Sequence, residues 1–224
     1  MLLAASAGHA AELAGVVHLR QTGLFQDSAA APAPMGGISV SLQPLEGQSL
    51  PPRGPTRRHR LLLQDGQMHP AFLTLQVGDS LQILNQDEVH HEIFALSASQ
   101  PIEAALDKNS TGAAAQAEFR LASEGVWHLF CRIHSRSFAR VDAVTTPLLR
   151  MVEPGESFRF DGLAAGQWQL RIAALGAETR QLKTVAMTEP PPLRIELDTR
   201  GGGAVGQRQA APVEARIDAL FPRD

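Results

Sequence analysis

The sequence predicts an all-β protein made of two consecutive β-sandwiches. Apolar and polar residues alternate in short runs along the chain, which is the pattern of strands with one buried face. Glycine, proline, asparagine and aspartate separate these runs at short intervals, as they do in sandwich folds. The register of the pattern changes between Thr145 and Pro154. We therefore expect one sandwich before this segment and a second one after it.

The alternating runs identify candidate core residues, because side chains on one face of a strand recur at every second position. One segment departs from the pattern: Glu103–Leu121 is rich in alanine and is read either as a helix or as an excursion between strands. The expected inward-facing residues are Ile38, Val40, Leu42, Leu61, Leu63, Leu73, Leu75, Val77, Leu81, Ile83, Trp127, Leu129, Cys131, Val141, Ala143, Phe158, Phe160, Trp168, Leu170, Ile172, Leu193, Ile195 and Leu197.

The composition excludes several classes of function. Of the 224 residues, 44% are hydrophobic and 19% are charged, which is ordinary for a globular protein and unlike a coiled coil or a disordered acidic chain. The formal net charge of −3 gives no electrostatic basis for binding nucleic acid. No stretch approaches the roughly 20 apolar residues that cross a bilayer. We therefore expect no transmembrane segment and no nucleic acid as a partner. We also expect the protein to be a monomer.

Both ends of the chain are expected to lie outside the folded domains. The first residues are short, small and apolar, and residues 1–11 fit a signal peptide cleaved near Ala10 or Ala11. The alternative is an alanine-rich terminus. Export would place the protein in the periplasm or cell envelope. A glycine-rich run that begins at Thr199 opens an expected flexible tail, residues 199–224.

The single cysteine, Cys131, needs an explanation in an exported protein, because a free thiol there is a liability. A buried, inert side chain is one explanation. The segment GVWHLFCRIH supports another, since alternation puts Trp127, Leu129 and Cys131 on one strand face and His134 can curl back toward them. The upstream segment NQDEVHHEIF supplies another histidine. One thiolate and two imidazoles form a trigonal set that suits copper electron transfer.

These segments resemble the small blue-copper proteins, the cupredoxins of the plastocyanin, pseudoazurin and amicyanin kind. The family segment G-x-[YW]-x-[FYL]-x-C-x-x-H matches Gly125, Trp127, Leu129, Cys131 and His134. Further matches are Pro70, Val77-Gly78-Asp79-Ser80-Leu81, Asn85-Gln86-Asp87 and His91-Glu92-Ile93-Phe94. The greatest similarity is to the methylamine-utilisation-type cupredoxin proteins of bacterial exported proteomes.

The resemblance implies a Greek-key cupredoxin domain at residues 12–146, expected to fold as a fragment that ends near Thr146. It implies one mononuclear copper site with His91, Cys131 and His134 as the metal ligands, whereas His69, His90 and His128 would be bystanders. It also implies an electron carrier that docks to a redox partner protein. We do not expect an enzyme, because a lone site of this kind lacks the extra copper centres that oxidases use.

Two positions depart from the family pattern. Relatives have an axial methionine after the second histidine, whereas this loop has Ser137 or Phe138 at that position. Glu92 replaces an asparagine that ties the two ligand loops together, and a carboxylate cannot donate a hydrogen bond unless it is protonated. Three alternatives therefore stay open: a metal-free cupredoxin that serves as an envelope interaction module, a copper storage or delivery protein, and a zinc site.

Residues 147–198 resemble carboxypeptidase-regulatory-like and collagen-adhesin-B-like domains, which implies a smaller, transthyretin-like sandwich. The matching segment, F-x-F-x-x-L-x-x-G-x-[YW], is formed by Phe158, Phe160, Leu163, Gly166 and Trp168. Leu163 and Trp168 are expected to pack inward, with Gly166 allowing a tight turn. Domains of this kind serve as spacers or interaction modules, and we find no catalytic set of residues in this segment.

Overall fold

The computed structural model describes residues 11–22, 36–45, 47–97, 100–109 and 114–200. Every regular element in these residues is a β-strand, sixteen in all, and the strands form four sheets. The prediction of an all-β fold is therefore confirmed. The described part of Glu103–Leu121 holds most of β8 (Ile102–Leu106) and all of β9 (Ala115–Arg120) and no helix. The helix reading is therefore wrong, and the segment contributes two strands of its own rather than a mere excursion between strands.

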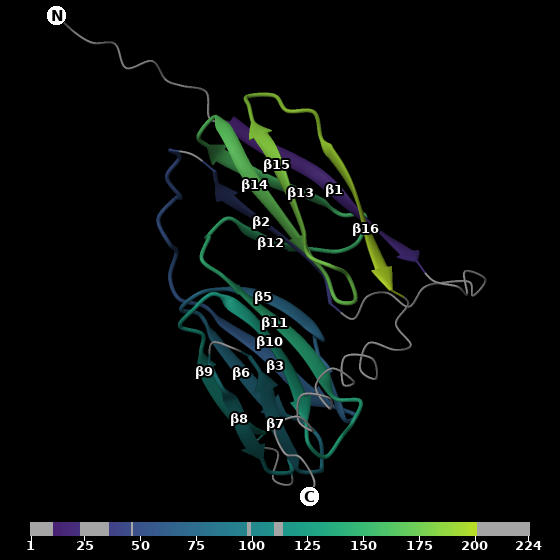
Figure 1. The fold of residues 1–224 in the computed structure, drawn as a ribbon. Coiled ribbons are helices and arrows are strands. Elements are labelled where there is room, and N and C mark those ends of the chain that lie inside the picture. The colour runs from purple at the N-terminus through teal and green to yellow at the C-terminus, as the bar shows by residue number, and fades with distance from the viewer. Residues whose placement is uncertain (1–10, 23–35, 46, 98–99, 110–113, 201–224) are drawn as a thin grey trace, which may run out of the picture.

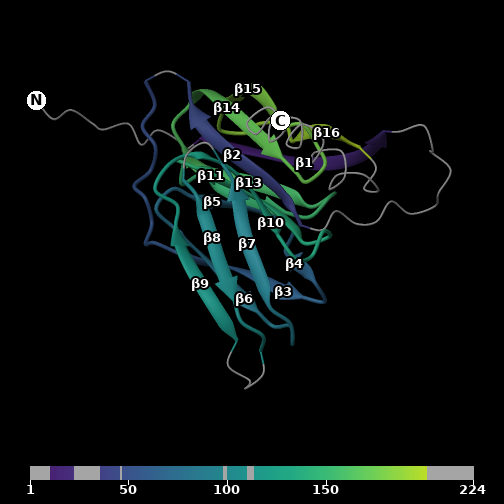
Figure 2. The same ribbon diagram turned by 60° about the horizontal axis from the view of Figure 1, so that its bottom comes forward.

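The first sandwich consists of strands β3 to β11. A five-stranded sheet in the order β5-β11-β10-β7-β8 packs on a four-stranded sheet in the order β4-β3-β6-β9. Figure 2 shows β7 and β8 side by side at the front of this sandwich. The remaining strands are β3 (Arg58–Gln64), β4 (Gln67–His69), β5 (Phe72–Gln76), β6 (Ser80–Asn85), β7 (His91–Leu96), β10 (Gly125–Cys131) and β11 (Phe138–Val144).

The second sandwich consists of a three-stranded sheet in the order β13-β1-β16 and a four-stranded sheet in the order β12-β2-β14-β15. Phe158, Phe160, Leu163 and Trp168 are buried in its core, and the inward packing expected of Leu163 and Trp168 is confirmed. The strands are β1 (Ala11–Thr22), β2 (Ile38–Pro44), β12 (Leu149–Val152), β13 (Ser157–Leu163), β14 (Gly166–Ala173), β15 (Arg180–Ala186) and β16 (Leu193–Arg200).

The strand pairing differs from the domain boundaries that the sequence suggested. The first two strands, β1 and β2, lie within the domain expected at 12–146 except for Ala11, yet they pair with β12, β13, β14 and β16 of the second sandwich. Figure 1 shows β1, in purple, beside β16, in yellow. The alternation of Ile38, Val40 and Leu42 identifies a strand with one buried face, but it does not identify the partner of that strand.

The first sandwich is thus inserted into the second one. The chain leaves the second sandwich after β2 and re-enters it at β12, and these two strands are antiparallel neighbours. The backbone N–H of Leu42 donates to the carbonyl of Leu148 over 3.0 Å, just before β12 begins. The exit and the return of the chain therefore lie close together, which is the arrangement that lets a domain be inserted into another.

A buried ion cluster joins the two sandwiches. Asp142 of β11 is fully buried and accepts hydrogen bonds from Arg140 of the same strand at 2.8 and 2.9 Å. It also accepts one from Arg171 of β14 at 2.7 Å. Arg140 reaches Thr179 of the second sandwich over 3.2 Å. One carboxylate and two guanidinium groups therefore link the strand that follows the ligand loop to the second sandwich.

Some sequence predictions lie outside the described residues. These are residues 1–10 of the expected signal peptide and the tail beyond residue 200. Ala11, the last residue assigned to the signal peptide, is buried and begins β1. Residues 199 and 200, assigned above to the tail, belong to β16. No helix in the described part of the chain is long and apolar enough to cross a membrane.

Candidate metal centre

Two of the three predicted ligands lie on neighbouring strands of the five-stranded sheet, and the third, His134, lies in the loop between β10 and β11. Cys131 is the last residue of β10, at the end of the buried row that contains Trp127 and Leu129. His91 is the first residue of β7, which pairs with β10 so that Cys131 lies opposite Ile93. His91 and Ile93 are both buried, since they are two positions apart on one strand face. Both side chains therefore point into the same end of the sandwich.

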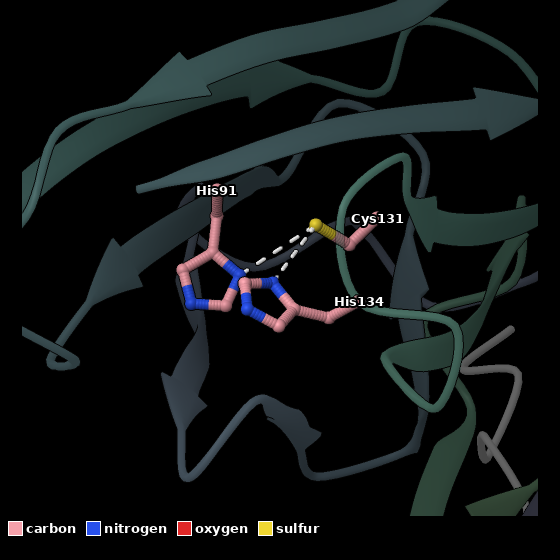
Figure 3. A group of neighbouring side chains, drawn as sticks. All are labelled: His91, Cys131 and His134. Carbon is pink, nitrogen blue, oxygen red and sulfur yellow. Dashed lines mark hydrogen bonds between the residues drawn. The ribbon is translucent and has the colours of Figure 1, made fainter. Parts of the chain in front are cut away.

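The donor atoms of these residues converge. The Sγ atom of Cys131 lies 3.6 Å from Nδ1 of His91 and 3.6 Å from Nδ1 of His134. Figure 3 shows the three side chains pointing toward one another. The ligand atoms of all three residues lie within 4.8 Å of one another. Metal bonds of about 2.3 Å to sulfur and about 2.0–2.1 Å to nitrogen, separated by about 120°, hold the donors about 3.7 Å apart. The spacing therefore fits a metal ion held by all three residues.

Burial differs among the three side chains. His91 has no exposed surface and Cys131 is 6% exposed, whereas His134 is half-buried. The two imidazole rings lie with their centroids 4.4 Å apart. Of the three candidate ligands, His134 is therefore the one nearest to solvent.

Backbone hydrogen bonds hold the loop from Cys131 to Ser137. The N–H of Cys131 donates to the carbonyl of Ser137 over 3.3 Å, and the N–H of Ser137 donates to the carbonyl of His134 over 3.0 Å. The N–H of Arg132 donates to the carbonyl of Glu92 over 2.9 Å, which ties the loop to the strand of the first histidine. The link between the two ligand segments is thus made by backbone groups. The side chain of Glu92 is exposed and lies 3.8 Å from His90.

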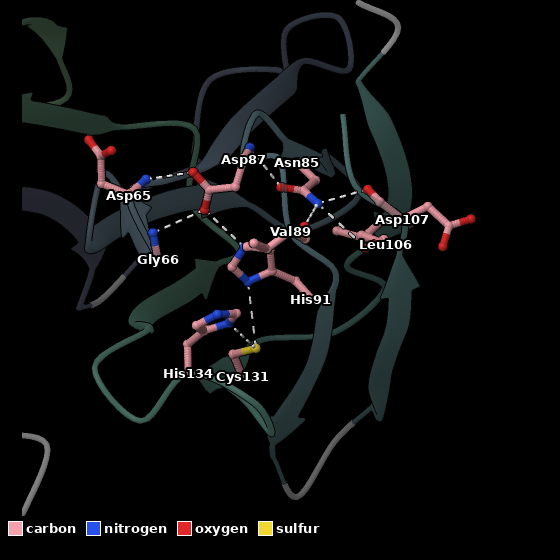
Figure 4. Close-up of polar contacts among 10 residues, drawn as sticks. All are labelled: Asp65, Gly66, Asn85, Asp87, Val89, His91, Leu106, Asp107, Cys131 and His134. Atoms are coloured by element: carbon pink, nitrogen blue, oxygen red, sulfur yellow. Dashed lines mark hydrogen bonds and ion pairs between the residues drawn. The ribbon is translucent and has the colours of Figure 1, made fainter. Parts of the chain in front are cut away.

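Asp87 orients the imidazole of His91. Its carboxylate lies 2.9 Å from Nε2 of His91 and accepts hydrogen bonds from the backbone N–H groups of Asp65, at 2.6 Å, and Gly66, at 3.0 Å (Figure 4). A carboxylate at Nε2 favours the tautomer that carries its proton there. The lone pair of Nδ1 is then free on the side that faces Cys131. In the sequence, Asp87 stands out only as part of the Asn85-Gln86-Asp87 motif, and this role was not predicted.

Asn85 shapes the loop between β6 and β7. It is fully buried, and its amide nitrogen donates to the carbonyls of Val89 and Asp107, each at 2.8 Å. Its Oδ1 accepts a hydrogen bond from the backbone N–H of Asp87 at 3.0 Å. The signal for this support is present in the sequence as Asn85-Gln86-Asp87 four residues before His91 and as the Asp65-Gly66 turn pair. What the sequence does not contain is the contact between these two segments.

The electrostatics of the site favour a neutral His91. Burial lowers the pKa of His91 below its ordinary value, and the neighbouring His134 lowers it further, although the Asp87 carboxylate acts in the opposite direction. Burial alone would raise the pKa of Asp87, but hydrogen bonds from Gly66, His91 and Asp65 outweigh it and hold this pKa below its usual range. A neutral imidazole beside an ionised carboxylate is the form that binds a metal.

The three histidines expected to be bystanders are not part of the cluster. His90 is 41% exposed in its side chain and lies near Asp107 and Glu92. His128 lies on the outward row of β10, where its ring stacks on Phe138 at 6.1 Å between centroids. His69 is in β4. Among the described residues, His91, Cys131 and His134 form the one group of three or more potential ligands with this spacing.

Comparison with known proteins gives similarity in structure alone. No protein-family model matches the sequence, and no curated protein does. A purple cupredoxin from Nitrosopumilus maritimus is 19% identical, with 38% of this chain and 98% of that chain covered and a TM-score of 0.32. A Cu(I) form of an amicyanin variant is 12% identical, with 47% and 98% covered and a TM-score of 0.34. A reduced amicyanin variant is 12% identical, with 47% and 98% covered and a TM-score of 0.35.

Proposed function

We propose that the protein is a copper-binding electron carrier with one mononuclear site. The observation that carries this proposal is the convergence of two Nδ1 atoms on the Cys131 sulfur at 3.6 Å. A thiolate is a ligand for Cu(I), and imidazole serves both Cu(I) and Cu(II). When bound, copper supplies the one-electron redox chemistry, and His91, Cys131 and His134 hold it.

The surroundings of the ligands support electron transfer. Backbone hydrogen bonds fix the Cys131–Ser137 loop, and Asp87 fixes the tautomer of His91. Ligands held in this way change position little between oxidation states, which keeps the cost of reorganisation low. An electron would enter or leave the copper near the half-buried His134 while a redox partner protein is weakly docked there. We find no basis for an enzymatic role.

Export and the role of the second sandwich belong to the same proposal. An apolar segment at residues 1–11 supports export to the periplasm or cell envelope. The segment from Phe158 to Trp168 supports a carboxypeptidase-regulatory-like spacer or interaction module. Mass spectrometry of the protein isolated from its native envelope tests export, for which we expect a first residue near Ala11 or Glu12. An intact Met1 in the cytosol would exclude it.

The visible absorption spectrum tests the metal site. We expect the protein, loaded with Cu(II) and freed of excess metal, to hold about one copper and to be blue or green, because a Cu(II)–thiolate bond gives an intense charge-transfer band. Cys131→Ser should lose the band and His134→Ala should weaken the site. His90→Ala is the matched control, since His90 is exposed beside the site, and it should keep the band.

Each alternative has its own outcome in this experiment. A colourless protein with less than about one copper supports the metal-free interaction module. A colourless protein that instead retains one zinc supports a zinc site, which a cysteine and two histidines can also form. A protein that shows the charge-transfer band but readily loses its copper to a chelator supports copper storage or delivery. A band that survives Cys131→Ser excludes the Cys131 sulfur as the source of the colour.

A further inference from the structure

We propose that the hydroxyl oxygen of Ser137 is a fourth ligand of the bound copper. This inference rests on the proposed function and concerns the side of the site that the sulfur and the two nitrogens leave open. Three donors in a trigonal set leave such a position for a further, weaker ligand. Three observations support it: the register of Ser137, its burial, and the lack of a partner for its hydroxyl.

The register places Ser137 directly opposite Cys131. Strands β10 and β11 pair antiparallel, with Leu129 opposite Ala139 and Phe130 opposite Phe138. The next pair in this register is Cys131 and Ser137, and the N–H of Cys131 does donate to the carbonyl of Ser137. Directly opposed residues have their Cβ atoms about 4.5–5.5 Å apart on one face of the sheet. The Ser137 side chain is therefore a cross-strand neighbour of the Cys131 thiol.

Burial identifies the face on which this pair lies. Ala139, Val141 and Ala143 of β11 are buried in the core of the first sandwich, and Ser137 continues their row at two-residue spacing. Ser137 is 1% exposed. Phe138, on the opposite face, has its ring against Phe130 with 5.2 Å between centroids. Of the two residues that the sequence left open, Ser137 points inward with the ligands and Phe138 points outward.

The hydroxyl of Ser137 lacks a hydrogen-bond partner. Its Oγ is buried and unpaired, and among the unpaired buried atoms of the described residues it is the one that belongs to the loop from Cys131 to Ser137. Buried polar atoms are nearly always paired, so an unpaired one requires an explanation. A metal held by Cys131, His91 and His134 would supply the partner. The oxygen is a harder donor than the thioether of methionine, and we therefore expect it to favour Cu(II) over Cu(I).

Ser137→Ala tests the proposal, with Ser135→Ala as the matched control. Ser135 lies in the same loop but is exposed. We expect Ser137→Ala to change the electron paramagnetic resonance spectrum of the Cu(II) form. It should also lower Cu(II) affinity relative to Cu(I) affinity by roughly tenfold, the lower end of what supporting groups at metal sites contribute. Ser137→Met should shift the preference further toward Cu(I). Ser135→Ala should leave both quantities unchanged.

Thermal unfolding without metal separates ligation from a structural role. Ser137→Ala removes an unpaired hydroxyl, so the metal-free variant should be as stable as the wild type or more stable. The increase in melting temperature on adding Cu(II) should become smaller. If the variant keeps the wild-type spectrum and affinity ratio while the Cys131-dependent band persists, Ser137 is not a ligand and the electron carrier stands. If the wild type holds no copper, both proposals fail.

Discussion

The two sandwiches have cores of the same kind and differ in what lies at their ends. Trp127 and Trp168 are fully buried, one in each core. Each indole N–H donates to a backbone carbonyl, that of Gln100 at 2.8 Å in the first sandwich and that of Ala164 at 3.0 Å in the second. In both cores the polar group of the largest side chain is thus paired with a backbone carbonyl. The cores alone do not distinguish a site-bearing sandwich from one without a site.

The difference lies in the buried polar residues. In the first sandwich Asn85, His91 and Cys131 are buried at one end and joined to loops by hydrogen bonds. In the second sandwich, the ion pairs of the described residues lie mainly at the surface, as for Arg20 with Asp198. Exposed pairs contribute little to stability, typically about 0–1 kcal/mol. Burial of polar groups is costly unless they are paired, and Asn85 and His91 are both buried and paired close to Cys131.

The experiment with the largest expected effect is truncation of the chain, which tests whether the two sandwiches fold independently. A fragment of residues 1–146 lacks β12 to β16, so β1 and β2 lose every strand with which they pair. The buried faces of Ile38, Val40 and Leu42 would be exposed to water. We expect this fragment to aggregate or bind a hydrophobic dye, in contrast to the expectation from sequence. A fragment of residues 45–146 should unfold cooperatively and keep the metal site.

Limited proteolysis checks this prediction. In the fragment 1–146, cleavage should occur readily within residues 11–44 and leave the remainder intact. Protection of residues 11–44 in a soluble monomer would mean that β1 and β2 have found partners in the first sandwich. The described pairing would then not determine the stability of these strands.

The contrast between predicted and observed boundaries has a physical reason. Alternation is a local property, and it correctly identified β2 through Ile38, Val40 and Leu42. Strand pairing joins residues far apart in the chain: Gly15 lies opposite Leu193 in the pairing of β1 with β16. No local pattern in the sequence records such a pairing. The change of register at Thr145–Pro154 does mark a passage between sandwiches, but it marks only one of the two passages.

The same distinction applies to the candidate site: some of its features follow from neighbouring residues in the sequence, and others depend on contacts between distant segments. Cys131 and His134 are three residues apart, and their segment was sufficient to predict that they lie together. His91 was found through resemblance to a family. The support by Asp87 depends on the turn at Asp65 and Gly66, which lies more than twenty residues upstream, and the unpaired hydroxyl of Ser137 depends on burial. These features emerge only from the packed structure.

The second-largest effect tests whether the ion cluster joins the sandwiches into one cooperative unit. Asp142→Asn leaves Arg140 and Arg171 without their shared carboxylate in a buried position. Breaking a buried ion pair by removing one partner typically costs about 3–5 kcal/mol. We expect a loss of this size in the free energy of unfolding, measured with urea. The control is Asp161→Asn, which breaks an exposed pair with Arg159 and should cost less than about 1 kcal/mol.

The two tryptophans allow each sandwich to be followed separately in that experiment. Trp168→Phe leaves Trp127 as the reporter of the first core, and Trp127→Phe leaves Trp168 as the reporter of the second. If the cluster couples the sandwiches, Asp142→Asn should separate the two unfolding transitions. Coincident transitions at the wild-type urea concentration would mean that Asp142 contributes neither stability nor coupling.

A smaller effect tests whether the polar network of the first sandwich supports the metal. Asp87→Asn keeps the side-chain volume but removes the charge that orients His91. Loss of such a supporting group typically lowers metal affinity roughly 10- to 100-fold, and we expect a loss in this range by competition with a copper chelator. The control is Asp107→Asn, since Asp107 is almost fully exposed. Equal affinities of wild type and Asp87→Asn would remove Asp87 from the site.

The smallest effect concerns acid and a second buried carboxylate of the first sandwich, Asp79. Its side chain is 4% exposed and accepts hydrogen bonds from Arg53 at 2.7 Å and from the Arg57 backbone at 3.0 Å, and it lies 3.0 Å from the ring of His59. Burial alone would raise the pKa of Asp79, but the backbone N–H of Arg57, followed by His59 and Arg53, outweighs it and holds the pKa below its ordinary value.

A carboxyl whose pKa is lower in the folded state stabilises the fold above its ordinary pKa, and this contribution is lost as the pH falls through the folded value. We therefore expect the first sandwich, followed by Trp127 in a Trp168→Phe background, to lose stability below about pH 4. One proton gives a slope of at most about 1.4 kcal/mol per pH unit. Asp79→Asn should be less stable at neutral pH and should flatten this slope. A variant that keeps the wild-type slope would show that other carboxylates cause the acid sensitivity, and the contrast between the two sandwiches would then not depend on Asp79.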